Sequence, residues 1–163
     1  MTADPWPGGA ARVRLCAELS AEWKESLEEL LFFNPQQALL EKKILETIHA
    51  FGLPRIIDHH GRLSIELGDS TAPGALFALV GAGEDEHLAG LLLFLRKDAG
   101  LLCLHMSVAE DYSSRGPRAS LRVAMRLLDE LRKIGSRIAG VNHIEVYYKR
   151  SGWQRLPLTA RLV

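Results

Sequence analysis

The segment Val108-Ala109-Glu110-Asp111-Tyr112-Ser113-Ser114-Arg115-Gly116-Pro117-Arg118-Ala119-Ser120-Leu121 decides the fold class, because it joins two segments of different character. Residues 101–108, which lead into it, form an apolar run of the length expected for a buried strand. Residues 117–134, which follow, place apolar side chains at helical spacing, and Pro117 suits the first helical turn. A short strand is expected next, at 136–141. Strand, helix and strand in this order predict a right-handed crossover between two parallel strands. The expected buried face of the helix is Leu121, Ala124, Met125, Leu128 and Leu131.

The strands before this unit predict an antiparallel meander. Residues 75–80, 87–96 and 101–108 follow one another with short polar turns between them. These strands are apolar on both faces, so both faces of the sheet should be covered. After the crossover, a helix is expected at 143–150 and a closing strand from Trp153 onward. The sequence therefore predicts a single α/β domain with a mixed central sheet, an antiparallel meander plus one parallel crossover, and helices on both faces.

The N-terminal half is expected to add two helices and a hairpin to this sheet. Residues 1–10 contain prolines and glycines without periodicity and are expected to be a loose arm, so that the domain spans 11–163. The segment Asn34-Pro35-Gln36-Gln37 carries the residues of a helix N-cap and capping box. The expected elements are a strand at 11–15, helices at 21–31 and 35–51, and a hairpin of strands at 55–57 and 62–67. The second helix should bury Leu40, Ile44, Leu45, Ile48 and Phe51.

Composition is that of a globular domain, but the charge is unevenly distributed. The 163 residues are 47% hydrophobic and 25% charged, which excludes disordered and collagenous chains. Residues 1–111 carry a net charge of −8 and residues 112–163 a net charge of +8. Two explanations are open: the C-terminal third faces an anion, or the two halves neutralise each other across the fold. The longest apolar run, Leu91 to Leu95, is too short to cross a membrane and the N-terminus has no apolar signal core, so we expect a cytoplasmic protein.

No metal site and no disulfide framework are expected. The two cysteines, Cys16 and Cys103, have no partners at the spacing of a zinc site. His59 and His60 follow Asp58 in a predicted turn, where adjacent side chains point apart. We interpret these cysteines and histidines as structural residues.

A strand that runs through a glycine-containing loop into a helix N-terminus is suited to holding phosphate, because unpaired amides and the helix dipole favour an anion. Here the loop also offers hydroxyl groups and the guanidinium groups of Arg115 and Arg118. Arg118, Arg122 and Arg126 recur at every fourth residue and would form a basic ridge along a helix. The ridge either extends an anion site or is a solvated helix face. Nucleic-acid binding is not expected, because no aromatic residues interleave with these arginines.

Residues 108–121 and 147–153 resemble two motifs of the GCN5-related N-acetyltransferases, the GNAT superfamily. In this family a strand ends in a loop with the pattern Val-x-x-x-x-Arg/Gln-x-x-Gly-x-Gly/Ala, whose amides hold the pyrophosphate of coenzyme A. The segment Tyr147-Tyr148-Lys149-Arg150-Ser151-Gly152-Trp153 is similar to the family's Leu-Tyr-x-x-x-Gly-Phe ending. The resemblance implies a GNAT-like order of elements over 75–163. It also implies an acetyltransferase that transfers acetyl from acetyl-CoA to an amine of a small molecule or a protein.

The resemblance assigns candidate site residues. Tyr148 would be the general acid for the departing thiolate. An amide of the strand between Met106 and Val108 would bind the oxyanion, at a bulge in the sheet. The candidate bases are His105, Glu110 and His143. The acyl-CoA ligands would be Met106, Val108, Ser113, Ser114, Arg115, Gly116, Arg118 and Ala119.

The loop departs from the family pattern at three positions. Ser113 stands in the place of Arg or Gln, Arg118 stands in the place of Gly or Ala, and Pro117 removes one amide donor. Arg118 either binds the phosphate directly or fills the pocket. The alternative function is therefore a catalytically inactive binding or regulatory module of the same fold.

Two further expectations concern partners. The predicted helix at 21–31 is acidic, which suits a cationic amine or is simply a solvated face. Its carboxylates are Glu22, Glu25, Glu28 and Glu29. An exposed edge strand near 153–163 would allow two subunits to pair as a homodimer.

Overall fold

The computed structural model describes residues 12–34, 41–68, 72–81, 83–148 and 150–159. Its centre is a six-stranded sheet in the order β1-β5-β6-β7-β8-β9. The strands are β1 (Arg12–Cys16), β5 (Gly74–Gly81), β6 (His87–Lys97), β7 (Gly100–Val108), β8 (His143–Tyr148) and β9 (Gly152–Pro157). Within this sheet β7 and β8 run parallel, and all other neighbours are antiparallel. The fold is therefore α/β with a mixed sheet, and the predicted meander with one parallel pair is confirmed.

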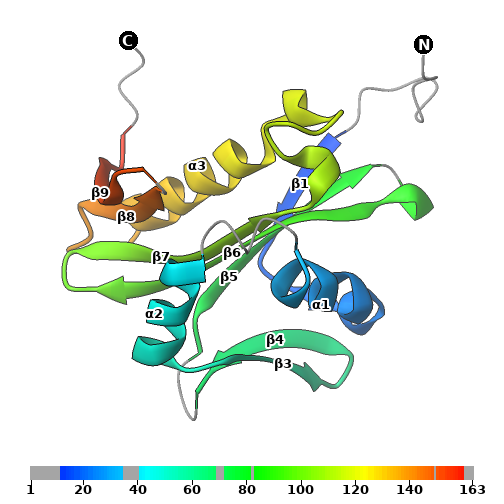
Figure 1. The fold of residues 1–163 in the computed structure, drawn as a ribbon, viewed down its shortest axis with the longest axis horizontal. Helices are drawn as coiled ribbons and strands as arrows, with labels where there is room; N and C mark the ends of the chain where they lie inside the picture. Colours follow the sequence, from blue (N-terminus) through cyan, green and yellow to red (C-terminus); the bar gives the residue numbers. More distant parts are fainter. Residues whose placement is uncertain (1–11, 35–40, 69–71, 82, 149, 160–163) are drawn as a thin grey trace.

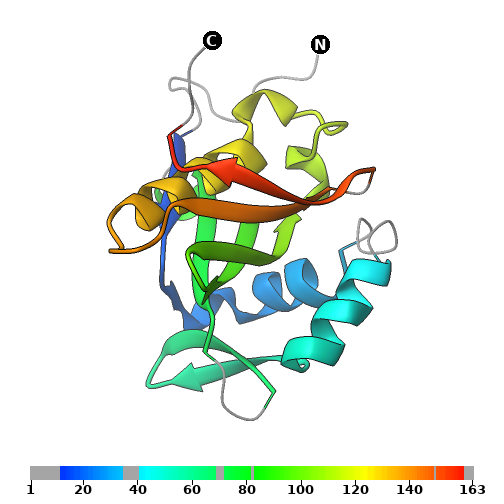
Figure 2. The same ribbon diagram turned by 90° about the vertical axis from the view of Figure 1, so that its left-hand side faces the viewer.

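In the described residues, three α-helices cover the two faces of this sheet: α1 (Lys24–Phe32), α2 (Glu41–Phe51) and α3 (Val123–Ser136). Helix α3 lies on one face, and α1 and α2 lie on the other (Figure 1). A small sheet, ordered β2-β4-β3, lies on the same side as α1 and α2, as the turned view also shows (Figure 2). Its strands are β2 (Leu19–Ser20), β3 (Pro54–His59) and β4 (Arg62–Leu67). None of these helices is long and apolar enough to span a membrane.

Two hydrophobic cores lie on opposite faces of the six-stranded sheet. The core under α3 includes Val123, Leu127, Leu128 and Leu131 of that helix. The core on the other face includes Leu27, Leu30 and Leu31 of α1 and Leu63, Ile65 and Leu67 of the small sheet. Each fully buried leucine stabilises the fold by roughly 1.5–3 kcal/mol. The predicted coverage of both sheet faces is confirmed.

The helix expected from Pro117 begins only at Val123. A 3₁₀ turn at Ala119–Leu121 precedes it, and Arg122 has a left-handed backbone with φ of 51°. A left-handed residue cannot continue a right-handed helix, so the α-helix starts after it. Met125, which was expected on the buried face, is exposed.

The strand expected at 136–141 and the helix expected at 143–150 are both wrong. Helix α3 continues through Ser136, and the chain then turns before β8 begins at His143. In β8, buried Ile144 and Val146 alternate with half-buried residues, which is the two-residue period of a strand. The β-branched and aromatic residues of this segment favour that conformation. The predicted crossover is present, but its second strand lies later in the chain than expected.

Helix α2 is described only from Glu41, so most of the predicted capping box and Leu40 lie outside the described residues, as does the arm at 1–10. Within the described part of α2, Leu45 is exposed, although it was expected in the buried stripe. Lys43 is buried instead. The buried side of α2 is therefore rotated from the expected one and includes a lysine.

Strand β7 contains a bulge at Leu104. Its register with β6 passes from Phe94↔Cys103 directly to Leu93↔His105, so Leu104 is the extra residue. A bulge turns two consecutive side chains to the same face and reverses the alternation beyond it. His105 therefore joins Leu104 on the α1 and α2 side of the sheet, where both line one cavity. The bulge was expected between Met106 and Val108 and lies two residues earlier.

Buried hydrogen bonds join the end of α1 to the end of β7. Asn34 Nδ2 donates to Ser107 Oγ at 2.6 Å and to Val108 O at 2.8 Å. The Ser107 hydroxyl donates in turn to Leu30 O at 2.8 Å. These bonds fix α1 over the point where β7 runs into its following loop. They therefore set the relative position of the two elements that enclose the pocket described below.

We predict that Asn34→Ala lowers the free energy of unfolding by about 1–3 kcal/mol, because Ser107 Oγ and Val108 O each lose a buried hydrogen bond. Urea unfolding followed by circular dichroism measures this change. The exposed Glu46→Ala on α2 is the control and should change stability by about 0.5 kcal/mol or less. Equal effects of the two substitutions would contradict a fixing role for Asn34.

Candidate functional site

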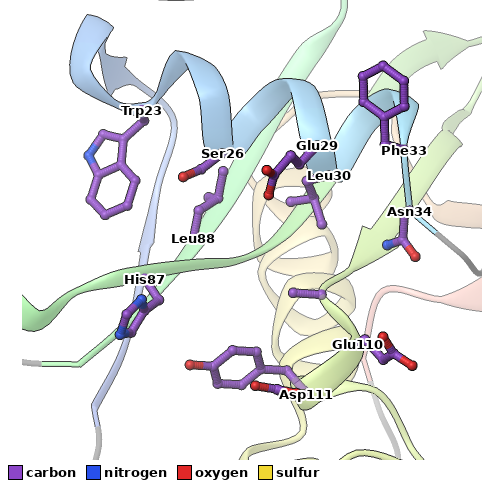
Figure 3. A pocket seen from close by; sticks show the side chains of 12 residues that line it. Trp23, Ser26, Glu29, Leu30, Phe33, Asn34, His87, Leu88, Glu110 and Asp111 are labelled. Carbon is purple, nitrogen blue, oxygen red and sulfur yellow. The ribbon is translucent and has the colours of Figure 1, made fainter.

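A pocket of about 440 Å³ lies between α1, the beginning of β6 and the loop after β7. Its lining is Trp23, Ser26, Glu29, Leu30, Phe33 and Asn34 from α1 and its ends, His87 and Leu88 from β6, and Ala109, Glu110, Asp111 and Tyr112 from the loop. Figure 3 shows the side chains of α1 on one side of this space and those of β6 and the loop on the other. We call it the acidic–aromatic pocket.

The acidic–aromatic pocket is suited to a cation. Glu29, Glu110 and Asp111 line it, and no lysine or arginine does so. None of these three carboxylates forms an ion pair with a described residue. Trp23 and Phe33 add aromatic faces, and Phe33 is 76% exposed. Carboxylates and aromatic faces both attract positive charge, so a cationic amine fits this lining.

The loop after β7 folds back on itself through its own backbone. The amide of Ser113 donates to Glu110 O, that of Gly116 to Ser113 O, that of Arg118 to Asp111 O and that of Ala119 to Gly116 O. A side chain at Gly116 would clash with the carbonyl oxygens of Glu110 and Asp111, so the loop's own packing requires this glycine. Four amides among the expected pyrophosphate ligands are therefore already paired.

Other groups of the same loop remain open to an anion. The amides of Ser114 and Arg115 donate to no described carbonyl, and neither do those of Ala124 and Met125 in the first turn of α3. Arg118 Nη1 donates to the Tyr112 hydroxyl at 2.8 Å, and its guanidinium lies 5.5 Å from the centre of that ring. Arg118 thereby connects the loop to the acidic–aromatic pocket. The prediction of a basic ridge along one helix is wrong. Arg126 lies within α3, whereas Arg118 and Arg122 precede this helix.

Strands β7 and β8 are paired over three residues and then separate. The pairs are Gly100↔His143, Leu101↔Ile144 and Leu102↔Glu145. Beyond them β7 continues to Val108 and β8 to Tyr148 without further pairing between the two strands. Because the strands are parallel, their separated carboxyl ends lie at the same end of the sheet, where the loop after β7 begins. The side of β7 that faces β8 is unpaired there, and an extended ligand can add hydrogen bonds to it.

The structure places the expected reaction residues on different faces of the sheet. Tyr148 is exposed at the end of β8 and, by alternation with buried Ile144 and Val146, lies on the α3 face. It stands on a strand, whereas the last helix was expected to carry it. Met106 and Val108 also contact the α3 core, and His105 lies on the opposite face.

Lys43 of α2 reaches the region where β8 and β9 pair. Its Nζ lies 5.7 Å from the ring centre of Tyr147 and 5.5 Å from that of Trp153, and the two rings meet edge to face. Both distances are within the range of cation–π attraction. Burial lowers the pKa of the Lys43 ammonium, and a smaller interaction with Cys103 opposes this shift. This contact holds α2 against the last two strands.

His105 is neutral at physiological pH. Burial lowers the pKa of its imidazole to about 4, and the nearby charge of Lys43 adds to the effect. A group with so low a pKa is a weak general base at neutral pH. His105 also does not line the acidic–aromatic pocket, whereas Glu110, the second candidate, does. His143 pairs with Glu145 on β8, with Nε2 3.4 Å from Oε1.

The thiols and the histidine pair have structural surroundings. Burial raises the pKa of the Cys103 thiol to about 11, so this thiol stays protonated. The His59–His60 pair lies at the β3–β4 turn, where the amide of Gly61 donates to Asp58 Oδ1 at 2.8 Å. Within the described ranges, no three His, Cys, Asp or Glu side chains come together as metal ligands would.

Comparison of the chain with family models, curated proteins and solved structures finds no match.

Sequence reasoning missed three features of the site region. No local pattern marks Trp23 or Phe33 as site residues, and His87 is expected only as a strand residue, because the pocket that joins them forms between distant segments. Lys43 was missed because a lysine in an amphipathic helix is normally solvated. A usable signal was available: Lys43 precedes Ile44 and lies four residues before Thr47, on the side of the helix that carries Ile44 and Ile48.

We predict that His105 makes the protein less stable as the pH falls from about 6.5 to 4. The unfolded chain binds a proton at the ordinary pKa of 6.5, while the folded chain resists it until about 4. Between these values the unfolded state holds more protons, so the free energy of unfolding falls with pH, by up to about 3 kcal/mol.

Urea unfolding of the wild type and of His105→Gln between pH 7 and pH 4 measures this contribution. The stability difference between the two proteins should change over that interval, whereas the exposed His49→Gln control should follow the wild-type profile. Parallel profiles for wild type and His105→Gln would show that His105 is not held neutral by the fold.

Proposed function

We propose that the protein is an acyl-CoA-dependent N-acyltransferase with a GNAT-like fold, which transfers acetyl from acetyl-CoA to a cationic amine. The observation that carries this proposal is the separation of β7 and β8 after three residue pairs, next to a strand–loop–helix unit. The separated edge of β7 runs from Cys103 to Val108. Coenzyme A has an extended arm with amide groups, which suits such an edge.

The phosphate groups of the same ligand would lie at the loop after β7. The open amides of Ser114 and Arg115 and the first turn of α3 offer donors there. Arg115 is exposed at this place, and Arg118 would exchange its bond to the Tyr112 hydroxyl for a charge-assisted bond to phosphate. The positive C-terminal third of the chain supports an anion at this site.

The acceptor amine would lie in the acidic–aromatic pocket, which adjoins the end of β7. Glu29 and Asp111 would hold its charge, and Glu110 would take the proton that the amine must lose. The amine nitrogen then attacks the thioester carbonyl carbon, the carbon–nitrogen bond forms, the carbon–sulfur bond breaks, and the nitrogen releases a second proton to solvent. The leaving thiolate takes a proton, for which exposed Tyr148 at the end of β8 is the proposed donor.

A second candidate function is a catalytically inactive binding module of the same fold. The observation that favours it is the internal pairing of the Ser113, Gly116, Arg118 and Ala119 amides, which removes donors from a phosphate. The bond from Arg118 to Tyr112 further closes the loop on itself. The two functions differ in whether acetyl-CoA binds the native loop.

We predict that the wild-type protein binds acetyl-CoA with micromolar affinity and that Arg118→Ala weakens binding about tenfold, because a charge-assisted contact to phosphate is lost. Titration calorimetry measures both. Arg137→Ala, an exposed arginine just after α3, is the matched control and should bind like the wild type. Binding by Arg118→Ala but not by the wild type would instead mean that Arg118 keeps the cofactor out, which supports the second function.

We further predict that Glu29→Gln raises the KM for 1,4-diaminobutane about three- to tenfold, because one carboxylate that holds the cation is neutralised. Release of the coenzyme A thiol reports the rate. Glu110→Gln should mainly lower kcat, and Tyr148→Phe should do so as well if its phenol protonates the thiolate. Glu25→Gln, on an exposed position of α1 outside the pocket, is the control. Equal effects of Glu25→Gln and Glu29→Gln would place the acceptor elsewhere.

A further inference from the structure

One side-chain contact joins the acidic–aromatic pocket to the loop after β7. Tyr112 lines the pocket, whereas Arg118 lies in the loop and is not one of the lining residues. Arg118 Nη1 donates a hydrogen bond to the Tyr112 hydroxyl at 2.8 Å, and its guanidinium carbon lies 5.5 Å from the centre of the ring. A residue of the proposed phosphate site therefore holds a positive charge against a wall residue of the proposed amine site.

Tyr112 is the fixed member of this pair and Arg118 is the adjustable one. The Tyr112 side chain is 7% exposed and packs in the core under α3. Close packing leaves such a ring little room to move. Arg118 is half-buried, and its amide donates to Asp111 O at 2.8 Å, which fixes its backbone in the loop. The long side chain can change direction about that fixed point, so a change in the contact moves the guanidinium and not the ring.

The charge of Arg118 opposes a cation in the pocket. Glu29, Glu110 and Asp111 attract a protonated amine there, and a positive charge beside the wall works against them. Tyr112 is buried and Arg118 is half-buried, and salt screens charges in such surroundings less than it screens charges in free solvent. Moving this guanidinium away from Tyr112 therefore strengthens the attraction of the pocket for an amine.

A phosphate at the loop gives Arg118 a reason to move. A charge-assisted bond from a guanidinium to a phosphate oxygen is stronger than a bond to a neutral hydroxyl. We propose that Arg118 and Tyr112 couple the two ligands of the proposed transferase: when Arg118 exchanges the Tyr112 hydroxyl for a phosphate of acyl-CoA, the acidic–aromatic pocket binds the cationic amine more tightly. This inference rests on the proposed function, because it needs a phosphate-bearing ligand at the loop and an amine in the pocket.

Titration calorimetry of the full chain measures this coupling. The ligands are 1,4-diaminobutane and coenzyme A, which carries the phosphates but has no acyl group to transfer. The Kd of each ligand is measured alone and with the other ligand at saturation. Because coupling between two binding sites is reciprocal, we expect each ligand to tighten the binding of the other by the same factor, about fivefold. Kd values that do not change would overturn the proposal.

Two substitutions test whether the coupling passes through this contact. Arg118→Gln removes the charge, so 1,4-diaminobutane alone should bind about three- to fivefold more tightly than it binds the wild type. Tyr112→Phe keeps the ring and removes the hydroxyl, so coenzyme A should bind about threefold more tightly because Arg118 breaks no hydrogen bond to reach it. In both variants the coupling factor should fall below about twofold. The control is Arg137→Gln, which removes an exposed charge just after α3 and should keep the wild-type coupling.

The outcomes separate this inference from the proposed function. Independent binding of coenzyme A and the amine would overturn the coupling and leave the transferase proposal standing, whereas no binding of coenzyme A would overturn both. Coupling that persists unchanged in Arg118→Gln and Tyr112→Phe would show that the two ligands attract each other directly, and would overturn the role of this contact. Thermal unfolding of each variant confirms that it is folded.

Discussion

The structure depends on the short parallel pairing of β7 with β8. Three residue pairs join these strands, and α3 spans the connection between them. This pairing holds the β8–β9 hairpin in the sheet. It also places the carboxyl ends of β7 and β8 at the same end of the sheet, where the loop after β7 begins. Because the pairing ends at Leu102, the rest of β7 has a free edge beside that loop. The α1 helix is fixed over the same place by Asn34 and Ser107, so the acidic–aromatic pocket forms where the sheet opens.

A second constraint is the bulge at Leu104. It reverses the alternation of β7 and turns His105 away from the α3 core, into the layer formed by α1 and α2. There the imidazole loses its solvent and lies near Lys43, which explains its low pKa. One extra residue in a strand therefore accounts for a buried histidine that is a weak base at neutral pH.

Much of the fold follows from the sequence, because apolar runs and turn residues mark the meander and its hairpin. The crossover was also predictable, but its boundaries were not. The segment at 143–150 begins after an asparagine that suits a helix cap, while its alternating Ile144 and Val146 favour a strand, and sheet pairing decided between them. The helix start was misplaced because nothing in the sequence requires Arg122 to be left-handed. Of the site, the loop and Glu110 were identified, whereas the pocket lining depends on long-range packing that no local pattern encodes.

The central claim is that the free edge of β7 and the loop after it form one ligand site. Amide hydrogen exchange of the full chain with and without acetyl-CoA tests this claim most directly. We expect slower exchange in two segments together, residues 103–108 of β7 and residues 114–125 of the loop and first turn of α3, with little change in β1 or in the β3–β4 hairpin. Unchanged exchange in both segments at millimolar acetyl-CoA, or protection confined to a distant surface, would contradict it.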